Sequence, residues 1–334
     1  MINTSLEVFN KSFRFSIAPM VDYTDKHFRV LIRQITKKSY LYTEMVVAQA
    51  LFHTSNKNKF LNFSKIEHPI SLQLGGNNPE ELAYSASLAE EWGYDEVNFN
   101  LGCPSSKVKS GNFGACLMNQ TAKVARCIEA MANSTKLPIT VKHRIGVDNF
   151  ENNSFLLNFL DNASNAGAKR FSIHARKALL NGLSPKENRE IPPLNYEKVF
   201  ELKKLRPNLI IELNGGINSP KKCNEFRKNV DGIMVGRSIY KNPMLWKDID
   251  QLLFNIPTKK ILPSEIIENL IPYIEEHLKS GGKTWDIAKH FLNLVQNVSG
   301  AKKWRENIRK NALSRKTDIS FLEKAVNELK ETGL

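Results

Sequence analysis

The sequence has 334 residues, of which 41% are hydrophobic and 25% are charged, and its formal net charge is +14. These values are ordinary for a globular protein. No apolar run approaches the roughly 18 residues that a membrane-spanning helix needs. Four cysteines without a CxxC pair or a Cys/His cluster argue against a disulfide framework and against a bound metal.

The composition predicts a cytoplasmic protein with a polyanionic partner. The N-terminal segment lacks the basic start, apolar stretch and small-residue cleavage site of a secretory signal. The 48 Lys and Arg residues outnumber the 34 Asp and Glu residues, which favours nucleic acid or a membrane surface as partner. No terminal segment has the basic amphipathic pattern of a membrane-surface helix. We therefore expect a nucleic acid partner and no membrane.

Strand-like and helical segments alternate through the first two thirds of the chain. The expected strands are Phe13–Ala18, Leu41–Val46, Pro69–Leu74, Glu96–Gly102, Pro138–Arg144, Arg170–Ala175, Leu209–Asn214 and Gly232–Gly236. Expected helices between them include Pro79–Trp92, Thr121–Ser134 and Phe155–Ala166. Strands recur about every 30 residues, the length of a βα unit, and eight units predict a (β/α)8 TIM barrel. A doubly wound sheet is the alternative, disfavoured because no G-x-G-x-x-G follows the first strand.

The fourth expected strand leads into the most informative segment, residues 98–118, NFNLGCPSSKVKSGNFGACLM. Pro104 fixes its own backbone and favours an extended conformation for Cys103, so the thiol is held on a stiff turn just past a strand end. Asn100 can project its amide toward the same place, and two glycines allow the next loop to fold back over it. The alternative is a buried structural cysteine. The other cysteines, which we expect to be structural, are Cys116, Cys127 and Cys223.

A barrel places catalytic side chains at the C-terminal ends of several strands. The strand ends here carry Pro19-Met20, Glu44, Gln73, Asn100 with Cys103, Lys142 with Arg144, His174 with Arg176, Asn214-Gly215-Gly216 and Gly236-Arg237. The last two groups follow strands seven and eight, where barrels commonly hold a phosphate. Glycines let the backbone approach the phosphate, and Arg237 can neutralise it.

Flavin mononucleotide (FMN) suits the other strand-end residues. Lys142 and Gln73 are suited to the O2, N1 and N3 edge of the isoalloxazine ring, and Lys142 would stabilise the negative charge of the reduced ring. Pro19 and Met20 would cover one face of the ring with apolar atoms. His174 is equally consistent with a structural hydrogen bond and with a ligand contact.

The last part of the chain reads as helices only, with expected boundaries of 1–250 for the barrel and 251–334 for a helical domain. The expected helices are Ser264–Lys279, Lys283–Val298, Ala301–Leu313 and Ile319–Glu331. Between Lys302 and Lys316 there are seven basic residues and one acidic residue. A charge run is often only a solvated face, but Trp304 among the charges favours a nucleic-acid surface with a stacking platform. The basic residues are Lys302, Lys303, Arg305, Arg309, Lys310, Arg315 and Lys316.

Motifs along nearly the whole chain match one known family. They are IAPMVDYTDKHFR, LYTEM, LQLGG, NFNLGCPS, GNFGACLM, TVKHRIG, IHARKALLNGLSPKENREIPPL, ELNGGI and DGIMVGR. With them the chain resembles the tRNA-dihydrouridine synthases. The segment 177–194 and the C-terminal HFLNLVQNVSGAKKWR resemble the bacterial A-type subgroup, whose helical tail binds RNA.

The resemblance implies reduction of the uracil C5–C6 double bond in the D-loop of tRNA, at position 20 or 20a. Reduced FMN would deliver a hydride from N5 to C6, NADPH would re-reduce the flavin, and Cys103 would protonate C5. A thiol is mostly protonated at neutral pH and can give a proton to a carbon. Asn100, Arg144 and Arg189 would lie on the substrate side. The basic run would contact the tRNA backbone, and we expect a monomer.

Two other readings of the sequence are possible. An FMN barrel dehydrogenase of a free pyrimidine would explain the strand ends and Cys103, but it leaves the net charge of +14 and the basic tail without a purpose. An RNA-binding protein with an inactive barrel would explain the tail, but it leaves Cys103, Lys142 and the phosphate site unexplained.

Overall fold

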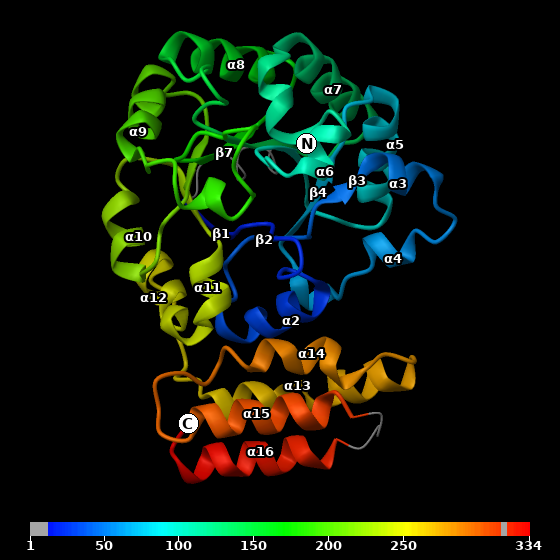
Figure 1. Cartoon of the computed structure of the whole chain (residues 1–334), viewed down its shortest axis with the longest axis vertical. Helices are drawn as coiled ribbons and strands as arrows, with labels where there is room; N and C mark the ends of the chain where they lie inside the picture. Colours follow the sequence, from blue (N-terminus) through cyan, green and yellow to red (C-terminus); the bar gives the residue numbers. More distant parts are fainter. Residues whose placement is uncertain (1–12, 315–318) are drawn as a thin grey trace, which may run out of the picture. The chain divides into compact units, whose positions relative to one another are not determined.

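The computed structural model describes residues 13–314 and 319–334. They form two compact units, one with residues 13–22 and 39–236, the other with residues 23–38, 237–314 and 319–334. Figure 1 follows the chain through both units. The expected boundary after residue 250 lies inside a short helix (Ile249–Phe254), whereas the compact units part after Gly236.

The first unit is a barrel of parallel strands (Figure 1). Its strands are β1 (Arg14–Ile17), β2 (Leu41–Tyr42), β3 (Val46–Val47), β4 (Ile70–Gly75), β5 (Glu96–Leu101), β6 (Ile139–Arg144), β7 (Arg170–His174), β8 (Ile211–Asn214) and β9 (Gly232–Val235). They pair in the order β1-β9-β8-β7-β6-β5-β4-β2, with β3 also on β4. A parallel bridge between Ser16 and Tyr40 joins the two ends of that order. The predicted TIM barrel is confirmed.

The expected strand Leu41–Val46 is interrupted. Leu41 pairs with Ile70 and Val46 with Leu74, so the stretch from β2 to β3 contains one more residue than the facing stretch of β4. An extra residue of this kind bends a strand and locally disrupts the ladder of hydrogen bonds. The Thr43 hydroxyl accepts a hydrogen bond from the Gln73 N–H at 3.0 Å and so replaces a ladder contact in the gap.

Helices surround the strands of this unit (Figure 1). Its α-helices are α3 (Ala48–His53), α4 (Asn58–Leu61), α5 (Pro79–Glu91), α6 (Ser106–Ser110), α7 (Thr121–Ser134), α8 (Asn153–Asn165), α9 (Tyr196–Leu205) and α10 (Pro220–Phe226), and its 3-10 turns are η1 (Lys65–Glu67), η2 (Gly114–Asn119) and η3 (Glu187–Arg189). Local signals fix several starts: Asn78 caps α5 ahead of Pro79, and Asn152 and Asn195 cap α8 and α9.

The barrel interior holds a buried ionic layer near the N-terminal ends of the strands. The Arg14 guanidinium donates to the Glu96 carboxylate at 2.7 Å and to the Tyr42 hydroxyl at 2.8 Å, and Tyr42 donates to Glu96 at 3.0 Å. Glu212, also buried, accepts hydrogen bonds from the Ser16 and Ser172 hydroxyls. Strands β1, β2, β5, β7 and β8 are thereby tied together through their side chains.

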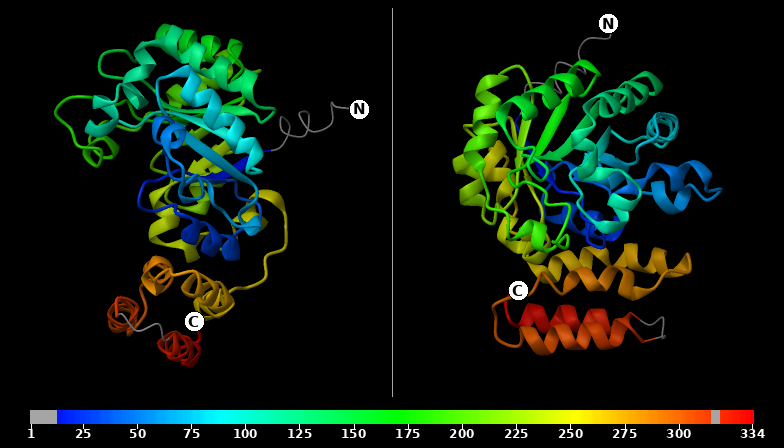
Figure 2. Two further views of the ribbon diagram at one scale, coloured as in Figure 1. Left: turned by 90° about the vertical axis from the view of Figure 1, so that its right-hand side faces the viewer. Right: turned by 45° about the horizontal axis from the view of Figure 1, so that its top comes forward.

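The second unit is helical. Its elements are α2 (Lys26–Ile35), α11 (Arg237–Lys241), η4 (Pro243–Trp246), α12 (Ile249–Phe254), α13 (Pro263–Lys279), α14 (Thr284–Phe291), α15 (Ala301–Ala312) and α16 (Ser320–Glu331). Two further views show α13 to α16 lying side by side (Figure 2). Asp25 caps α2 and accepts a hydrogen bond from His290 of α14 at 2.9 Å.

The expected helix Lys283–Val298 ends early, at Phe291. The residues beyond it include Asn293 and Asn297, which favour helices weakly, and Asn297 has a left-handed φ of 58°. The Gln296 amide donates instead to the Lys241 carbonyl. The segment therefore leaves the helix to contact α11 within the same unit.

Within residues 13–314 and 319–334, no helix combines the length and the apolarity that crossing a membrane requires.

Replacing Arg14 with Met is expected to lower the free energy of unfolding by about 3–5 kcal/mol, because it leaves the buried Glu96 carboxylate without the cation 2.7 Å away. Urea denaturation of the purified variant measures the change. The control is Arg206→Met, which removes a partly exposed pair with Asp161 and should cause a much smaller loss. Equal losses in the two variants would contradict a special role for the buried pair.

Candidate active site

The thiol of Cys103 lies just beyond the C-terminal end of β5, on a turn that the chain holds from both sides. Cys103 is half-buried. Its N–H donates to the Asn100 Oδ1 at 3.0 Å, and its carbonyl accepts from the Ala115 N–H at 2.9 Å. The Sγ donates to the Ser105 Oγ at 3.5 Å. The turn therefore presents the thiol in a fixed position, with its S–H directed at a hydroxyl.

The loop after Cys103 folds back over it, as Gly111 and Gly114 led us to expect. Gly114 has a φ of +73°, and a Cβ there would lie 2.7 Å from the Cys103 carbonyl oxygen. Only glycine allows this approach without displacing the turn. The Asn77 amide holds the tip of the loop by donating to the carbonyls of Gly111 and Asn112 at 3.1 and 3.0 Å.

Arg144, at the end of β6, is buried and donates to backbone carbonyls on two different loops. Its Nε donates to Gly102 at 2.8 Å, and its Nη1 donates to Lys177 and Asn188, both at 3.0 Å. Burial, opposed by the nearby Cys103 and assisted by Arg189 and Arg176, lowers the pKa of Arg144 to about 10. The guanidinium thus joins the cysteine turn to the loop that follows β7.

That loop, residues 177–194, is organised around the buried Asn188. The Asn188 Oδ1 accepts from the Leu179 N–H at 2.8 Å, and its Nδ2 donates to the Leu179 carbonyl at 2.9 Å. Lys109 of α6 donates to Asn181 at 2.5 Å, which connects the loop to the segment after Cys103. Arg189 is half-buried within η3. The loop is therefore rigidly built although it contains little regular structure.

Lys142 points from β6 toward β8. Its Nζ donates to the Asn214 Oδ1 at 3.2 Å, and the Asn214 Nδ2 donates to the Met234 carbonyl at 2.8 Å. Desolvation lowers the pKa of Lys142 to about 8, and the neighbouring Arg144 adds to that effect. Because burial makes the charged form of the ammonium group less favourable, that group binds an anionic or strongly polar partner readily.

The glycines after β8 and β9 lie against side chains from neighbouring strand ends. Gly215 and Gly216 have positive φ values of 113° and 63°. A Cβ on Gly215 would lie 3.2 Å from the His174 ring, and one on Gly216 would lie 2.4 Å from Leu194. A Cβ on Gly236 would lie 3.3 Å from the Met20 sulfur. Neighbouring side chains therefore pack closely against this backbone, and the glycines add no side chains of their own.

The structure brings most of the expected site residues to the C-terminal ends of the barrel strands. They are Pro19, Met20, Gln73, Asn100, Cys103, Lys142, Arg144, His174, Asn214, Gly215, Gly216 and Gly236, with Arg189 on the loop after β7. Arg237 directly follows Gly236 as the first residue of α11 in the second unit. Among the other cysteines, Cys127 and Cys223 are buried, whereas Cys116 is half-buried.

Three residues that shape the site were not predicted. Asn98 and Thr140 are buried and hydrogen-bonded into a network that reaches Asn100, and Asn188 organises the loop after β7. Asn98 could have been predicted, because it lies two residues before Asn100 and side chains two residues apart on a strand point to the same face. Over the described part of the chain, no group of His, Cys, Asp and Glu side chains has the arrangement of a metal site.

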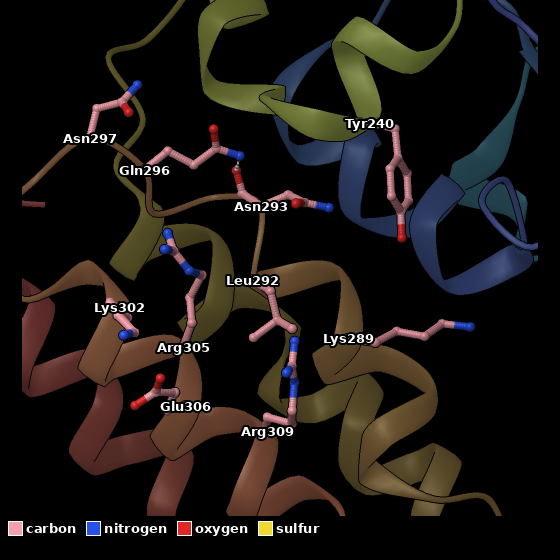
Figure 3. Close-up of a pocket in the computed structure, with 10 residues that line it drawn as sticks. All are labelled: Tyr240, Lys289, Leu292, Asn293, Gln296, Asn297, Lys302, Arg305, Glu306 and Arg309. Carbon is pink, nitrogen blue, oxygen red and sulfur yellow. Dashed lines mark hydrogen bonds between the residues drawn. The ribbon is translucent and has the colours of Figure 1, made fainter. Parts of the chain in front are cut away.

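The second unit contains a separate basic pocket of about 610 Å³. Figure 3 shows its lining side chains, which come from α11, from α14, from the segment after α14, and from α15. Its cations are Lys289, Lys302, Arg305 and Arg309, and its acid is Glu306. Lys289 is paired with Asp25 at 2.6 Å, and the Arg305 Nη1 donates to the Val295 carbonyl at 2.8 Å.

The expected stacking role of Trp304 is wrong. Its side chain is only 6% exposed, and its Nε1 donates to the Ala325 carbonyl of α16 at 3.1 Å. Trp304 belongs to the core of the helical unit. Lys303 is exposed but does not line the pocket. The last two basic residues of the run, Arg315 and Lys316, lie outside the described residues.

Comparison with known proteins gives near full-length matches. The model of the family described as dihydrouridine synthase matches residues 16–330. A Synechocystis protein named tRNA-dihydrouridine(20/20a) synthase is 47% identical over 321 residues, which are 96% of this chain and 93% of that protein. Proteins of the same name from Salmonella typhimurium and Shewanella oneidensis are 45% and 48% identical, over 94% and 89% of this chain and 95% and 88% of their own lengths.

Proposed function

The chain belongs to the dihydrouridine synthase family, and from that premise we propose that it reduces the C5–C6 double bond of a uridine in tRNA. The product is 5,6-dihydrouridine, and the names of the similar proteins support positions 20 and 20a as the targets. The observation that carries the proposal is the Cys103 turn, in which a half-buried thiol lies beside Asn100 at a strand end. A uridine in a loop reaches such a site at least cost, because little stacking is lost.

FMN fits the residues at the strand ends. The glycines at positions 215, 216 and 236 provide backbone without side chains for the phosphate, and Arg237 follows directly. Lys142 and Gln73 suit the polar edge of the ring, Pro19 and Met20 suit its apolar face, and the His174 ring packs on Gly215. When bound, FMN supplies the hydride that C6 of the uracil receives, and NADPH supplies the electrons for the next turnover.

The protein's own part in the reaction is to hold the base and provide a proton. The Cys103 Sγ–H donates to the Ser105 hydroxyl and can transfer its proton to C5 of the uracil. Negative charge develops on the uracil carbonyl oxygens as the double bond is reduced, and Arg189 is a cation that can stabilise it. Asn100 orients the cysteine turn and faces the substrate side. Arg144 supports the site by fixing Gly102 and the loop after β7.

The basic pocket of the second unit suits the phosphate backbone of tRNA. Lys302, Arg305 and Arg309 lie three and four residues apart, so they share one face of α15. The amides of Asn293, Gln296 and Asn297 line the same pocket and add uncharged hydrogen-bonding groups. Cations and amides together contact phosphate and sugar without reading sequence. Lys303 adds charge on the exposed surface of the helix.

Changing Cys103 to Ala should lower the rate of dihydrouridine formation by about 10²- to 10⁴-fold, the usual contribution of a general acid. The assay supplies NADPH and tRNA from cells lacking the gene, and maps dihydrouridine by nucleotide. The matched control is Cys116→Ala, which removes the other half-buried thiol and should retain wild-type activity. Reduction of free pyrimidines in preference to tRNA would instead support a dehydrogenase of a small substrate.

Affinity of the apoprotein for FMN should fall as pH rises through about 8. Lys142 carries its charge below its lowered pKa of about 8, and an anion binds the charged form better, so affinity is highest below that pH. Above it, the loss reaches at most about tenfold per pH unit. Fluorescence titration measures it. Lys142→Met should bind weakly at every pH without this fall, whereas Lys169→Met, an exposed lysine before β7, should behave as wild type. A pH-independent wild type would contradict the assignment.

Reversing two pocket charges, Lys302→Glu with Arg309→Glu, should weaken tRNA binding by about tenfold or more at low salt. The slope of log affinity against log salt should decrease by about one for each phosphate that the variant no longer neutralises. The control reverses two exposed lysines of α16, Lys324 and Lys330, and makes the same change in net charge. Filter binding over a salt series compares the two variants. Equal losses of affinity would show that only net charge matters.

A further inference from the structure

We propose that the buried carboxylate of Glu96 is a positioning group for Cys103, because it fixes the direction of a chain of side-chain hydrogen bonds that ends at the Cys103 N–H. The inference rests on the proposed function only in naming Cys103 as the proton donor. Its geometry lies entirely within the barrel unit.

The inner half of the chain runs between β5 and β6. The Thr140 hydroxyl donates to the Glu96 Oε1 at 2.7 Å. The same oxygen of Thr140 accepts from the Asn98 Nδ2 at 2.9 Å. All three side chains are buried and fully excluded from solvent. Asn98 and Thr140 are cross-strand partners in the register of β5 and β6, so the backbone itself brings them together.

The outer half of the chain runs from Asn98 to the turn. The Asn98 Oδ1 accepts from the Gln73 Nε2 at 2.8 Å, and the Gln73 Oε1 accepts from the Asn100 Nδ2 at 2.9 Å. The remaining end of that amide, the Asn100 Oδ1, accepts from the N–H groups of Gly102 and Cys103 at 3.1 and 3.0 Å. Gln73 and Asn98 are again cross-strand partners.

The chain has one possible direction because of the groups at its ends. An ionised carboxylate only accepts hydrogen bonds, and a hydroxyl has a single proton to give. Thr140 gives that proton to Glu96, so it must accept from Asn98. Each amide then turns its NH₂ inward and its oxygen outward, and the last oxygen faces the two backbone N–H groups of the cysteine turn. Backbone N–H groups only donate, so the groups at both ends of the chain require the same direction of donation.

Donors from the barrel occupy both oxygens of Glu96, so its carboxylate acts only as an acceptor. Arg14 donates to its second oxygen at 2.7 Å, and Tyr42 donates to its first at 3.0 Å. Burial by itself lowers the pKa of Arg14, but the charge of Glu96 and its other neighbours raises it well above the ordinary value. If an amide in the chain turned over, the Asn100 NH₂ would face the N–H groups of the turn, donor against donor. The turn would then be released from Asn100.

The test is Thr140→Val, which keeps the shape of the side chain and removes the hydroxyl that transmits the direction. We expect the iodoacetamide reaction of Cys103 in the holoenzyme to speed up about fivefold relative to that of Cys116, since a turn released from Asn100 exposes its thiol. Mass spectrometry of the two peptides gives the ratio within one sample. The kcat for tRNA should fall while KM stays near the wild-type value.

The matched control is Ser16→Ala. Ser16 is equally buried and also donates to a carboxylate, that of Glu212, at 2.7 Å, but it is not part of the chain to Cys103. Its ratio of Cys103 to Cys116 modification should equal the wild-type ratio. Asn98→Leu is the second chain variant, of similar volume, and it should shift the ratio as Thr140→Val does. It keeps the test available if Thr140→Val does not fold.

Two results would overturn the inference: an unchanged ratio in both chain variants, or the same shift in Ser16→Ala. An unchanged ratio in which the rates of Cys103 and Cys116 rise equally would mean general loosening of the barrel. Alkylation needs no tRNA, so the ratio can be measured whatever the activity. If the ratio shifts in the chain variants but the wild-type protein forms no dihydrouridine, the proposed function is refuted and the positioning of the cysteine turn still stands.

Discussion

The ion pair between Arg14 and Glu96 is the constraint on which the barrel and its site both depend. Closing parallel strands into a barrel buries the side chains of its interior, where a charge is stable only with a partner and further hydrogen bonds. Arg14 comes from the first strand and Glu96 from the fifth, so their contact at 2.7 Å ties distant parts of the sheet together. The same carboxylate gives the polar side chains above it a fixed direction. A stability element thus also orders the reactive end of the barrel.

The site above this layer is built mostly from side chains that contact backbone. Arg144 binds three carbonyls, Asn188 binds the backbone of its own loop, and Asn100 binds two N–H groups of the cysteine turn. Loops without regular structure have many backbone groups to satisfy, and buried ones must find partners. Side chains that satisfy them also fix the loop. Lys142 differs, because it is a buried cation that donates to the Asn214 side chain, and burial lowers its pKa to about 8.

Much of this could be predicted from sequence because strands and helices carry local periodic signals. The strands β4 to β7 and the helix α7 lie where the pattern placed them, and the turn at Cys103 follows from Pro104 and Gly114. The break between β2 and β3 could not be predicted, since it depends on a hydroxyl contact with a neighbouring strand. The chain from Glu96 to Asn100 also depends on register between strands, which the sequence of a single strand does not contain.

The helical periodicity around Trp304 was present in the sequence, but the prediction did not use it to place this side chain in the core. Trp304, Ile308 and Ala312 lie four residues apart and form one apolar stripe, and all three are buried. The basic residues occupy the remaining faces, so the helix is amphipathic, with one face in the core and the other charged. The pocket beside that surface exists because α14 ends at Phe291 and an amide-rich segment follows. The aromatic residue anchors the helix, and the charges thereby stay outside the core, where a polyanion can reach them.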